Sequence, residues 1–514
     1  MPCEEVRRLP LRPSQEWLVL SALLLATFGL RTVGWDQPIV ENYVGRQIPT
    51  AMVARNLDRG SGFLHPKLDT APFPNFFWVE PPIYAATVVA FHRLTGLELE
   101  PAGRLVSALA MTLGGWGLFG LTRRREGGVV AILALAAFTF FPLTIRYGRA
   151  FQPDAMMLGC LLAGFRCWDQ YERGDGQGWI IPGGVLIAVG LALKIVWAPL
   201  LVPLITLRHR RDVSEDRASG SGKERRIWLA RCAQIGLLVV PALLWYLHAA
   251  SAIADGGGSR ASADNRAIWM RVLVPTALLH VTTWANIGKF LCVRAFTPLG
   301  FLLGAVGALA IRGLDSLWRI WTATVLMTLS LLAAKLHHEY YWLMLAPVMA
   351  VGVGRSFVWL GARQRPLAVA VGLALLGLSA VQSRSTWRTP PEWSHLREAA
   401  KAIQDHVPND ALVVAPEALL FEADRRGCRL ELTGDAAMRA AGEWGGTLDR
   451  RDPLALIAFY KRQGARYLAD VATDDRVRLA LHKAIGRRYK IVVARPGVLL
   501  ADLTVKEEAP DGTR

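Results

Sequence analysis

Two arginines and an aspartate stand between two long apolar runs of this chain, in the segment RYGRAFQPDAMM. Arg146 and Arg149 end one run, and Asp154 begins the next. Charged side chains are costly to keep at a membrane boundary, so they are candidates for function. Arg146 and Arg149 have a spacing that, on one helical face, lets both reach a single anionic group. We therefore predict a phosphate-binding site with a carboxylate beside it.

Asp154 is the first candidate for a catalytic base in this site. Pro153 suits the first position of a helix, and Asp154 then falls in the first turn. Free N–H groups and the helix dipole favour a negative charge there. Simpler roles compete with these interpretations: Asp154 can be a helix cap and no more, and either arginine can extend only to lipid headgroups.

A second set of polar residues lies in the long segment from 35 to 101. Asp36 and Glu41 come first, and Arg46 and Gln47 stand just before PTAMVARNL, which we predict to be a helix opened by Pro49. Backbone donors gather at a helix start, so Arg46 and Gln47 are candidates for binding an anion. Further on, Glu80 in FFWVEPPIY precedes a second short helix. Glu41 and Glu80 are catalytic candidates, with simple solvation as the competing role.

A third set occupies the LHHEYYWLML turn, which offers His337, His338, Glu339, Tyr340 and Tyr341. Paired histidines invite a metal interpretation, but adjacent side chains on a helix do not converge. We favour hydrogen bonds from this turn to a phosphate or a sugar, and leave a divalent cation as an open alternative.

A lone lysine, Lys194, interrupts the apolar run LALKIVW near the end of a span. An ammonium group in that position is more readily explained by an anion partner than by contact with lipid.

The elements that must position these residues are membrane spans. The chain has 514 residues, of which 52% are hydrophobic, and it alternates long apolar runs with short basic loops. This composition predicts an all-α polytopic membrane protein with about eleven transmembrane helices. The expected spans are 15–34, 102–122, 128–147, 154–170, 178–193, 195–207, 229–250, 293–311, 318–335, 341–360 and 367–383. The first is too long and wrongly flanked for a cleaved signal peptide.

The net charge of the chain is +17, and much of the excess of basic residues lies in the short loops between the spans. The basic loops at 122–126, 208–226, 312–319 and 361–365 are typical of the cytoplasmic side, so we predict no nucleic-acid partner. With these loops inside, the three polar sets all face outward. This topology requires that PPIYAATVVAFHRL at 81–94 is not a span but an interfacial helix, interrupted by His92 and Arg93.

The pattern changes after Trp393 to that of a small α/β unit. Helical runs such as SHLREAAKAIQDH and DPLALIAFYKRQGA alternate with the β-rich runs ALVVAP, ARYLADV and YKIVVARPGVLLADL. We predict a soluble outer domain at 384–514, a transmembrane domain at 15–383 and a cytoplasmic N-terminus at 1–14. The six cysteines have no CxxC spacing, and Cys428 has no obvious partner. Neither SGSGKE nor GDGQG has the spacing of a nucleotide-binding loop, which argues against an ATP-driven pump.

The order of RQIPTAMVARNL, PPIY, GRLVSAL, RYGRAFQPDAMML, LALK and HHEYYWLMLAP resembles that of the type-C membrane glycosyltransferases of family 39, the protein mannosyltransferase and aminoarabinose transferase group. The likeness covers about 15 to 360. It implies transfer of a sugar from a polyprenyl-phosphate donor on the outer face of the membrane, usually with inversion. It also implies that Asp154 is the acid of the second outer loop, that Lys194 is a cationic site residue, and that Arg104 is the arginine opening the second span.

Two departures from the family pattern stand out. Many relatives carry an Asp-Glu pair just ahead of the first-loop helix, where this chain has Arg46 and Gln47. Relatives of the aminoarabinose type tend to have a lysine before the paired prolines, where this chain has Glu80. The usual general base is therefore missing from its usual place, and Glu41, Glu80 and Asp154 compete for that role.

Together these features predict an integral membrane glycosyltransferase, a hexosyl- or pentosyltransferase that acts by single displacement with inversion. The donor would be a polyprenyl-phosphate sugar, and the acceptor a periplasmic glycan, lipid or protein. The expected location is a bacterial inner membrane, in contact with its lipids, with the N-terminus cytoplasmic and the C-terminal domain periplasmic. The alternative is a flippase or transporter of lipid-linked sugars, whose polar residues should line a path at mid-membrane instead of gathering on one face.

Overall fold

The computed structural model describes residues 12–41, 44–205, 207, 221–256, 278–311, 316–333, 336, 338–471 and 476–505. By its internal contacts the chain forms two compact units. The helical unit comprises residues 1–35, 101–248 and 268–387, and the α/β unit comprises residues 36–100, 249–267 and 388–514. The long segment from 35 to 101, called the first loop from here on, was expected within the transmembrane domain. By its contacts, nearly all of it belongs instead to the same unit as the C-terminal domain.

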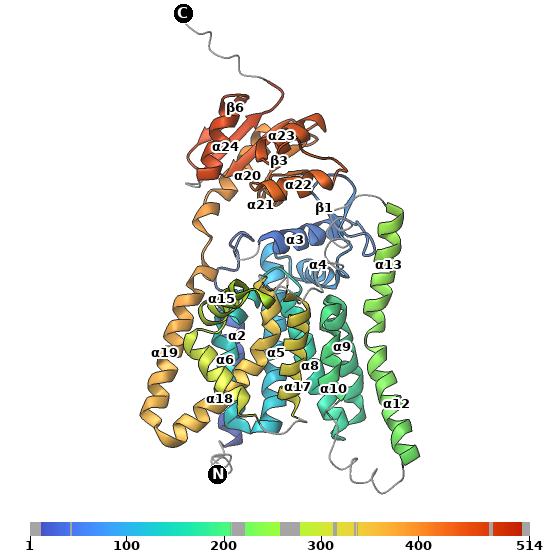
Figure 1. Cartoon of the computed structure of the whole chain (residues 1–514), viewed down its shortest axis with the longest axis vertical. Coiled ribbons are helices and arrows are strands. Elements are labelled where there is room, and N and C mark those ends of the chain that lie inside the picture. Colours follow the sequence, from blue (N-terminus) through green and yellow to red (C-terminus); the bar gives the residue numbers. More distant parts are fainter. Residues whose placement is uncertain are drawn as a thin grey trace, which may run out of the picture. The chain divides into compact units, whose positions relative to one another are not determined.

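Each apolar run predicted as a span contains helix (Figure 1). These α-helices are α2 (Pro13–Thr32), α5 (Leu99–Glu126), α6 (Gly128–Phe140), α7 (Pro142–Tyr147), α8 (Asp154–Glu172), α9 (Ile180–Leu193), α10 (Leu201–Ile205), α12 (Ser221–Leu237), α13 (Val240–Gly256), α15 (Val281–Lys289), α16 (Pro298–Leu309), α17 (Leu317–Leu331), α18 (Ala346–Arg363) and α19 (Arg365–Ser383). Short 3-10 or π-helical turns precede several of them: η1 (Gln177–Trp179), η2 (Ile195–Leu200), η4 (Phe290–Ala295) and η6 (Glu339–Leu345).

Not every predicted span is one long helix. Within the described residues, three helical stretches are long and apolar enough to cross a membrane, and five are if each of two bent pairs counts as one. The three are Leu99–Glu126, Glu339–Arg363 and Arg365–His406, and the bent pairs are Leu229–Leu237 with Val240–Ala254 and Val281–Ala295 with Pro298–Leu309. Four further apolar helices have 10–17 residues. The polytopic pattern holds, but several spans are shorter or more broken than predicted.

Proline explains the break in the span predicted at 128–147. Pro142 starts α7 and has no N–H, so the carbonyl of Phe138 loses its helical donor. The Thr144 hydroxyl donates to that carbonyl at 2.5 Å, and the Arg31 Nη2 lies 3.5 Å from it. Arg31, which is fully buried, also donates to the carbonyls of Thr27 and Thr144. A side chain of α2 therefore holds the broken helix together.

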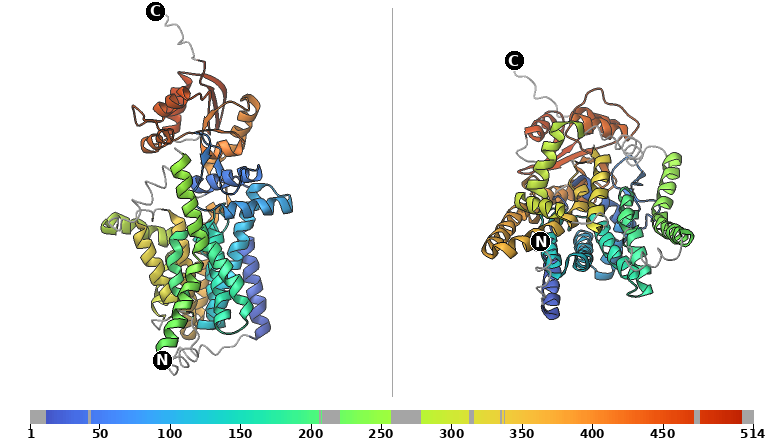
Figure 2. Two further views of the ribbon diagram at one scale, coloured as in Figure 1. Left: turned by 90° about the vertical axis from the view of Figure 1, so that its right-hand side faces the viewer. Right: turned by 60° about the horizontal axis from the view of Figure 1, so that its bottom comes forward.

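The helical unit is a bundle in which α18 packs on α6 and α16, α8 packs on α9, and α2 packs on α6 (Figure 2). Glycine sets the closeness of α16 to α18. A Cβ on Gly307 would lie 1.9 Å from the carbonyl oxygen of Gly352, and one on Gly352 would lie 2.0 Å from that of Gly304. Small residues of this kind let membrane helices approach closely and gain packing contacts.

The charges predicted to be cytoplasmic pair with one another at one end of this bundle. Arg123 binds Glu16 at 2.5 Å, and Arg125 and Arg124 bind Asp169 at 2.7 and 3.0 Å. Asp169 ends up buried at the far end of α8 from Asp154. The bundle thus separates the predicted inner charges from the predicted outer ones. Most of the basic loop at 208–226 lies outside the described residues.

The C-terminal part of the α/β unit is a five-stranded mixed sheet, as the sequence predicted in outline. Its order is β4 (Gly427–Arg429), β3 (Val413–Ala415), β5 (Tyr467–Val471), β7 (Val498–Asp502) and β6 (Lys490–Arg495). The first three strands run parallel, and β7 is antiparallel to both its neighbours. The helices are α20 (Leu396–His406), α21 (Glu417–Glu422), α22 (Gly434–Gly442), α23 (Pro453–Arg462) and α24 (Arg476–Gly486). Strand β4 was not predicted, because its residues, GCR, include none of the β-branched or aromatic types that marked the other strands.

The first loop contributes a second part of the α/β unit: α3 (Val44–Asp58), a hairpin of β1 (Lys67–Leu68) and β2 (Asn75–Phe76), and α4 (Ile83–Thr95). Two predictions here were wrong in detail. Pro49 does not open α3 but lies inside it, so Arg46 and Gln47 are helical residues. Pro49 removes one helical hydrogen bond, the one that an N–H at this position would donate to the carbonyl of Gly45. The predicted helix at 81–94 is not interrupted at His92, and ends only where Gly96 adopts a left-handed φ of 72°.

Candidate active site

The centre of the candidate site is a buried ion pair between Asp154 and Lys194. The Lys194 Nζ lies 2.5 Å from the Asp154 Oδ1, and the side chains are 9% and 1% exposed. Asp154 is the first residue of α8, where the helix dipole favours a negative charge. Lys194 follows the last residue of α9, where the dipole favours a positive one. The predicted anion partner of Lys194 is thus a carboxylate of the protein.

The other carboxylate oxygen of Asp154 is differently placed. Among the described residues, Oδ2 is buried and has no hydrogen-bond partner. A buried acceptor without a donor carries the full cost of its desolvation. This oxygen is therefore the atom of the pair that can still accept a proton or a hydrogen bond.

Two tyrosines of the LHHEYY turn cover Lys194. Its Nζ lies 4.1 Å from the ring centroid of Tyr340 and 5.2 Å from that of Tyr341. A tyrosine ring attracts an ammonium group through its negative face, and the attraction is stronger in a dry environment. His338 stacks on Tyr340 with the rings 5.5 Å apart, whereas His337 lies outside the described residues.

The same turn holds Arg146. Its Nη1 lies 3.0 Å from the Glu339 Oε2, and the Arg294 Nε lies 2.7 Å from the Glu339 Oε1. The Tyr147 hydroxyl also donates to Glu339 at 3.2 Å, and the Tyr147 ring packs edge-on against Tyr340. This second cluster adjoins the Asp154–Lys194 pair through Tyr340. Its two arginines share one carboxylate, so it keeps a net positive charge.

The prediction that Arg146 and Arg149 share one helical face was wrong. Helix α7 ends at Tyr147, so Arg149 lies beyond it. Arg149 is fully buried and donates to the carbonyls of Thr386 at 3.1 Å and Gly34 at 2.8 Å, while Arg146 meets Glu339. Gly148, the residue after α7, lies close to Arg31: a Cβ on Gly148 would lie 2.4 Å from the Arg31 Nε.

The sequence did not single out Arg31, Arg294 or Gln152. Arg31 and Arg294 are charges at the ends of apolar spans, so the reasoning that found Arg146 could have found them. Gln152 is fully buried, and neither atom of its amide has a hydrogen-bond partner among the described residues. Buried amides are almost always bonded, so Gln152 is a candidate ligand-binding residue. The predicted Arg104 is also fully buried and donates to the carbonyl of Trp35 at 3.0 Å.

In the α/β unit, the two positions that depart from the family pattern are paired with each other. The guanidinium of Arg46 forms an ion pair with the carboxylate of Glu80, and its Cζ lies 5.6 Å from the Phe77 ring centroid. Both charged side chains are mostly buried. Arg46 is thereby occupied by a protein carboxylate, and Glu80 is neutralised by an arginine.

Glu41 and Gln47 are also linked in this unit. The Gln47 amide donates to the backbone carbonyl of Glu41 at 2.5 Å, and both residues are buried. Gln47 thus fixes the chain at Glu41 instead of standing ready at a helix start. No group of three or more His, Cys, Asp or Glu residues in the described part of the chain could hold a metal ion.

The family described as dolichyl-phosphate-mannose-protein mannosyltransferase matches residues 79–249. That segment contains Glu80, Arg104, Arg146, Asp154 and Lys194. No curated protein matches the sequence.

Several solved structures share the fold. ArnT from Cupriavidus metallidurans bound to undecaprenyl phosphate has 15% sequence identity and a TM-score of 0.62, with 96% of this chain and 98% of that chain covered. The Archaeoglobus fulgidus oligosaccharyltransferase in complex with zinc and sulfate has 13% identity and a TM-score of 0.56, with 88% and 68% covered. The oligosaccharyltransferase AglB from the same organism, in complex with an inhibitory peptide and a dolichol-phosphate, has 11% identity and a TM-score of 0.55, with 89% and 69% covered.

These comparisons confirm the resemblance predicted from the sequence. The chain has the mostly helical, multi-pass membrane fold of ArnT with a small mixed-sheet domain at its C-terminal end. Its second to seventh predicted spans lie in the segment that matches the mannosyltransferase family. The predicted enzyme class, a glycosyltransferase, is that of the mannosyltransferase family that matches residues 79–249.

Proposed function

We propose that this protein transfers a sugar from a polyprenyl-phosphate donor to a hydroxyl or amine acceptor, with Asp154 as the general base and Lys194 as a donor phosphate contact. The observation that carries the proposal is the buried Asp154–Lys194 pair, whose Oδ2 has no partner in the described part of the chain. The family match and the ArnT fold suggest the class of donor, because the ArnT and AglB complexes hold undecaprenyl phosphate and dolichol-phosphate.

The pair can serve both partners of the reaction at once. An ammonium group has three N–H donors, so Lys194 can bind a donor phosphate while it keeps Asp154. Its charge then stabilises the negative charge that develops on the leaving phosphate. The excess positive charge of Arg146 and Arg294 around Glu339 acts in the same direction.

The transfer step is a single displacement. The acceptor oxygen or nitrogen attacks the anomeric carbon, and its proton passes to the Asp154 Oδ2 as the new bond forms. The bond from the anomeric carbon to the phosphate oxygen breaks, and its electron pair stays on the polyprenyl phosphate. The attack comes from the face opposite the leaving group, so the product has the inverted configuration.

Asp154 is a better base than the two competing acids. Glu80 and Asp154 are both ion-paired, but Asp154 keeps a buried carboxylate oxygen, Oδ2, without a hydrogen-bond partner in the described part of the chain. Glu41 is buried in the α/β unit, where its backbone is fixed by Gln47. We propose that these first-loop residues bind and orient substrate.

The proposed orientation follows the basic loops. With the ion-paired end of the bundle around Asp169 in the cytoplasm, the Asp154 end faces the periplasm or the cell exterior. Nucleotide sugars are absent there, which is why a lipid-linked donor is needed. The location in a bacterial inner membrane is part of this proposal.

The test is transfer by the purified protein in liposomes, with undecaprenyl-phosphate-linked hexoses and pentoses as donors and an extract of the cell envelope as acceptor. Release of undecaprenyl phosphate reports turnover for any acceptor, and the anomeric configuration of the product reports inversion. We expect Asp154→Asn to lower the rate by about 100-fold or more, and Glu41→Gln and Glu80→Gln to lower it less. Full activity of Asp154→Asn, or a product with retained configuration, would contradict the mechanism.

A further inference from the structure

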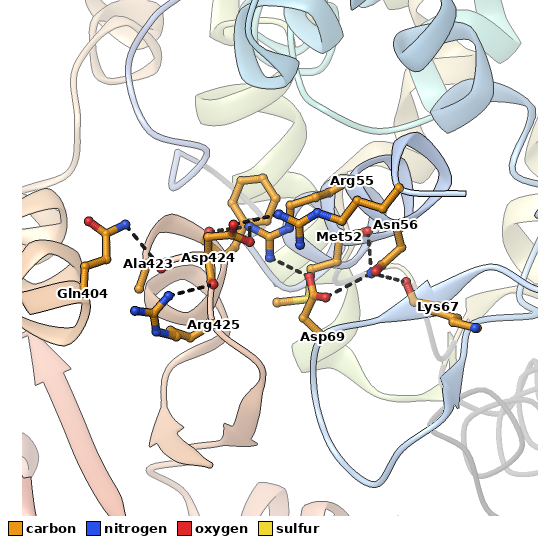
Figure 3. A network of polar contacts seen from close by, with 11 residues as sticks. Met52, Arg55, Asn56, Lys67, Asp69, Gln404, Ala423, Asp424 and Arg425 are labelled. Atoms are coloured by element: carbon orange, nitrogen blue, oxygen red, sulfur yellow. Dashed lines mark hydrogen bonds and ion pairs between the residues drawn. The ribbon is translucent and has the colours of Figure 1, made fainter. Parts of the chain in front are cut away.

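Arg55, near the end of α3, joins the first loop to the C-terminal domain. Its side chain is 10% exposed and has three partners. Nη2 lies 2.5 Å from the Asp69 Oδ2 in the first loop, and Nη1 donates to the carbonyl of Phe421 at 2.7 Å and meets the Asp424 Oδ1 at 3.1 Å. Figure 3 shows Arg55 between Asp69 and Asp424. One guanidinium thus connects elements more than 350 residues apart in sequence.

Arginine suits this place and lysine does not. A guanidinium has several donors in a fixed plane and can bind two groups in different directions, whereas an ammonium is a point charge. The Phe421 ring covers the guanidinium, with its centroid 4.4 Å from Cζ. Asn56 donates to the second oxygen of Asp69 at 3.1 Å, so that carboxylate is held from both sides.

Asp424 is held by a second arginine at the surface. The Arg59 Nη2 lies 2.7 Å from the Asp424 Oδ2, and both side chains are about half exposed. Partial burial tends to raise the pKa of Asp424, but the hydrogen bond from Arg59 and the charges of Arg55 and Arg59 outweigh it and hold that pKa below its usual value. The carboxylate therefore stays charged as an anchor for Arg55 at neutral pH.

A backbone contact ties the same two parts together. The Gly427 N–H donates to the carbonyl of Asp69 at 3.0 Å, and the Ala71 N–H donates to the carbonyl of Gly427 at 2.8 Å. Thr70 thereby pairs in parallel with Gly427, beside β4. Gly427 is required here, because a Cβ would lie 2.3 Å from the carbonyl oxygen of Val413. The first loop thus covers the edge of the C-terminal sheet.

The anchored helix carries two of the residues that we propose to bind substrate. Arg46 and Gln47 lie in the first turns of α3, and Arg46 is ion-paired with Glu80. Arg55 follows Arg46 by nine residues (55 − 46) on this helix, a distance of about 14 Å along a stiff rod. Because the helix is stiff, anchoring it at Arg55 also fixes the position of Arg46 near its other end.

We propose that Arg55 is a positioning residue, which anchors α3 to the C-terminal domain and so sets the place of Arg46, Gln47 and Glu80. The C-terminal domain is then a support for the donor-binding part of the first loop. This inference rests on the proposed function, in which these first-loop residues bind and orient substrate, and it takes that substrate to be the donor.

The experiment compares Arg55→Ala and Arg55→Lys with the wild type and with a matched control, Arg59→Ala, in the full-length protein in liposomes. Arg59 meets the same Asp424 but is half exposed and does not contact Asp69. The readouts are the KM for the undecaprenyl-phosphate sugar, kcat, and the melting temperature. Asp424→Asn is added because its half-exposed side chain can be changed without a buried gap.

We expect Arg55→Ala to raise the donor KM by about tenfold, because small displacements of binding groups have large effects on rate and affinity. Arg55→Lys should restore part of this loss, Asp424→Asn should raise the KM less, and Arg59→Ala should stay within about twofold of wild type. A purely structural role would lower the amount of active enzyme and leave the donor KM unchanged in Arg55→Ala and Asp424→Asn, and that result would overturn the proposal. An inactive wild type would instead refute the proposed function.

Discussion

Replacement of both members of the Asp154–Lys194 pair should separate its two effects, on stability and on transfer. The side chains are 1% and 9% exposed and 2.5 Å apart. Removing one partner leaves the other charge buried without compensation, which costs about 3–5 kcal/mol. Lys194→Met also loses the contact with the Tyr340 ring at 4.1 Å, worth about 0.5–2 kcal/mol.

The double variant, Asp154→Asn with Lys194→Met, has no buried charge at this place. Replacing a buried ion pair with neutral groups of similar size is often neutral or stabilising. We therefore expect the melting temperature to fall in each single variant and to recover most of the loss in the double variant. Transfer should not recover, because a general base contributes about 10²–10⁴-fold, or about 3–5 kcal/mol of transition-state stabilisation, and asparagine cannot accept the proton.

The assays are thermal unfolding in detergent and initial rates of undecaprenyl phosphate release in liposomes, normalised to folded protein. Asp169→Asn is the matched control, since Asp169 is a buried, arginine-paired acid on the same helix. It should lose stability but keep its rate for each folded molecule. If the double variant regains both stability and transfer, Asp154 is only a structural partner of Lys194.

Three further predictions concern other parts of the two units. Gln152→Ala should raise the KM for donor or acceptor by about tenfold with little loss of melting temperature, because the buried amide has no hydrogen bond to lose within the described residues. An unchanged KM and a lower melting temperature would mean that the amide has only a structural role. The charge reversals Arg46→Glu and Glu80→Arg should each lower activity by about tenfold or more. The double reversal should recover much of the activity, because the two side chains form one ion pair. If the loss of activity in the double variant is the sum of the two single losses in free energy, this prediction is wrong. The lowered pKa of Asp424 should stabilise the folded protein fully above about pH 4, and this stabilisation should disappear as the pH falls below that value. The difference in melting temperature between wild type and Asp424→Asn should therefore shrink only in acid. If the difference is the same at pH 3 and pH 7, the stabilisation does not come from the Asp424 charge.

Much of the fold could be read from local pattern. The spans follow from runs of apolar residues, and the C-terminal domain follows from alternating β-rich and helical runs, because both signals lie within short windows of sequence. The helix start at Asp154 and the C-terminal helix after Asp452 were also visible, since proline and an acid at a helix start act locally. The breaks within the spans could not be predicted. Pro142 can divide a span only because Thr144 and Arg31 donate hydrogen bonds to the carbonyl of Phe138, which has lost its helical donor.

The candidate site was predictable as a set of residues but not as a set of pairs. The cost of a charge beside an apolar span marked Arg146, Asp154 and Lys194 individually. Their partners could not be assigned, because Asp154 meets Lys194 across 40 positions and Arg146 meets Glu339 across 193. The wrong prediction for Arg149 has the same origin, since its partners, the carbonyls of Gly34 and Thr386, are 115 and 237 positions away.

The sequence alone thus determined that this is a membrane glycosyltransferase fold and which charged residues stand at the ends of its spans. Hydrophobicity and helix-end preferences are properties of neighbouring residues, so they survive without coordinates. The tertiary structure decided which charges neutralise one another: Lys194 pairs with Asp154, Glu80 pairs with Arg46, and Arg55 joins the first loop to the C-terminal domain. Electrostatic pairing depends on distance in space, and only the folded chain brings these groups within a few ångströms.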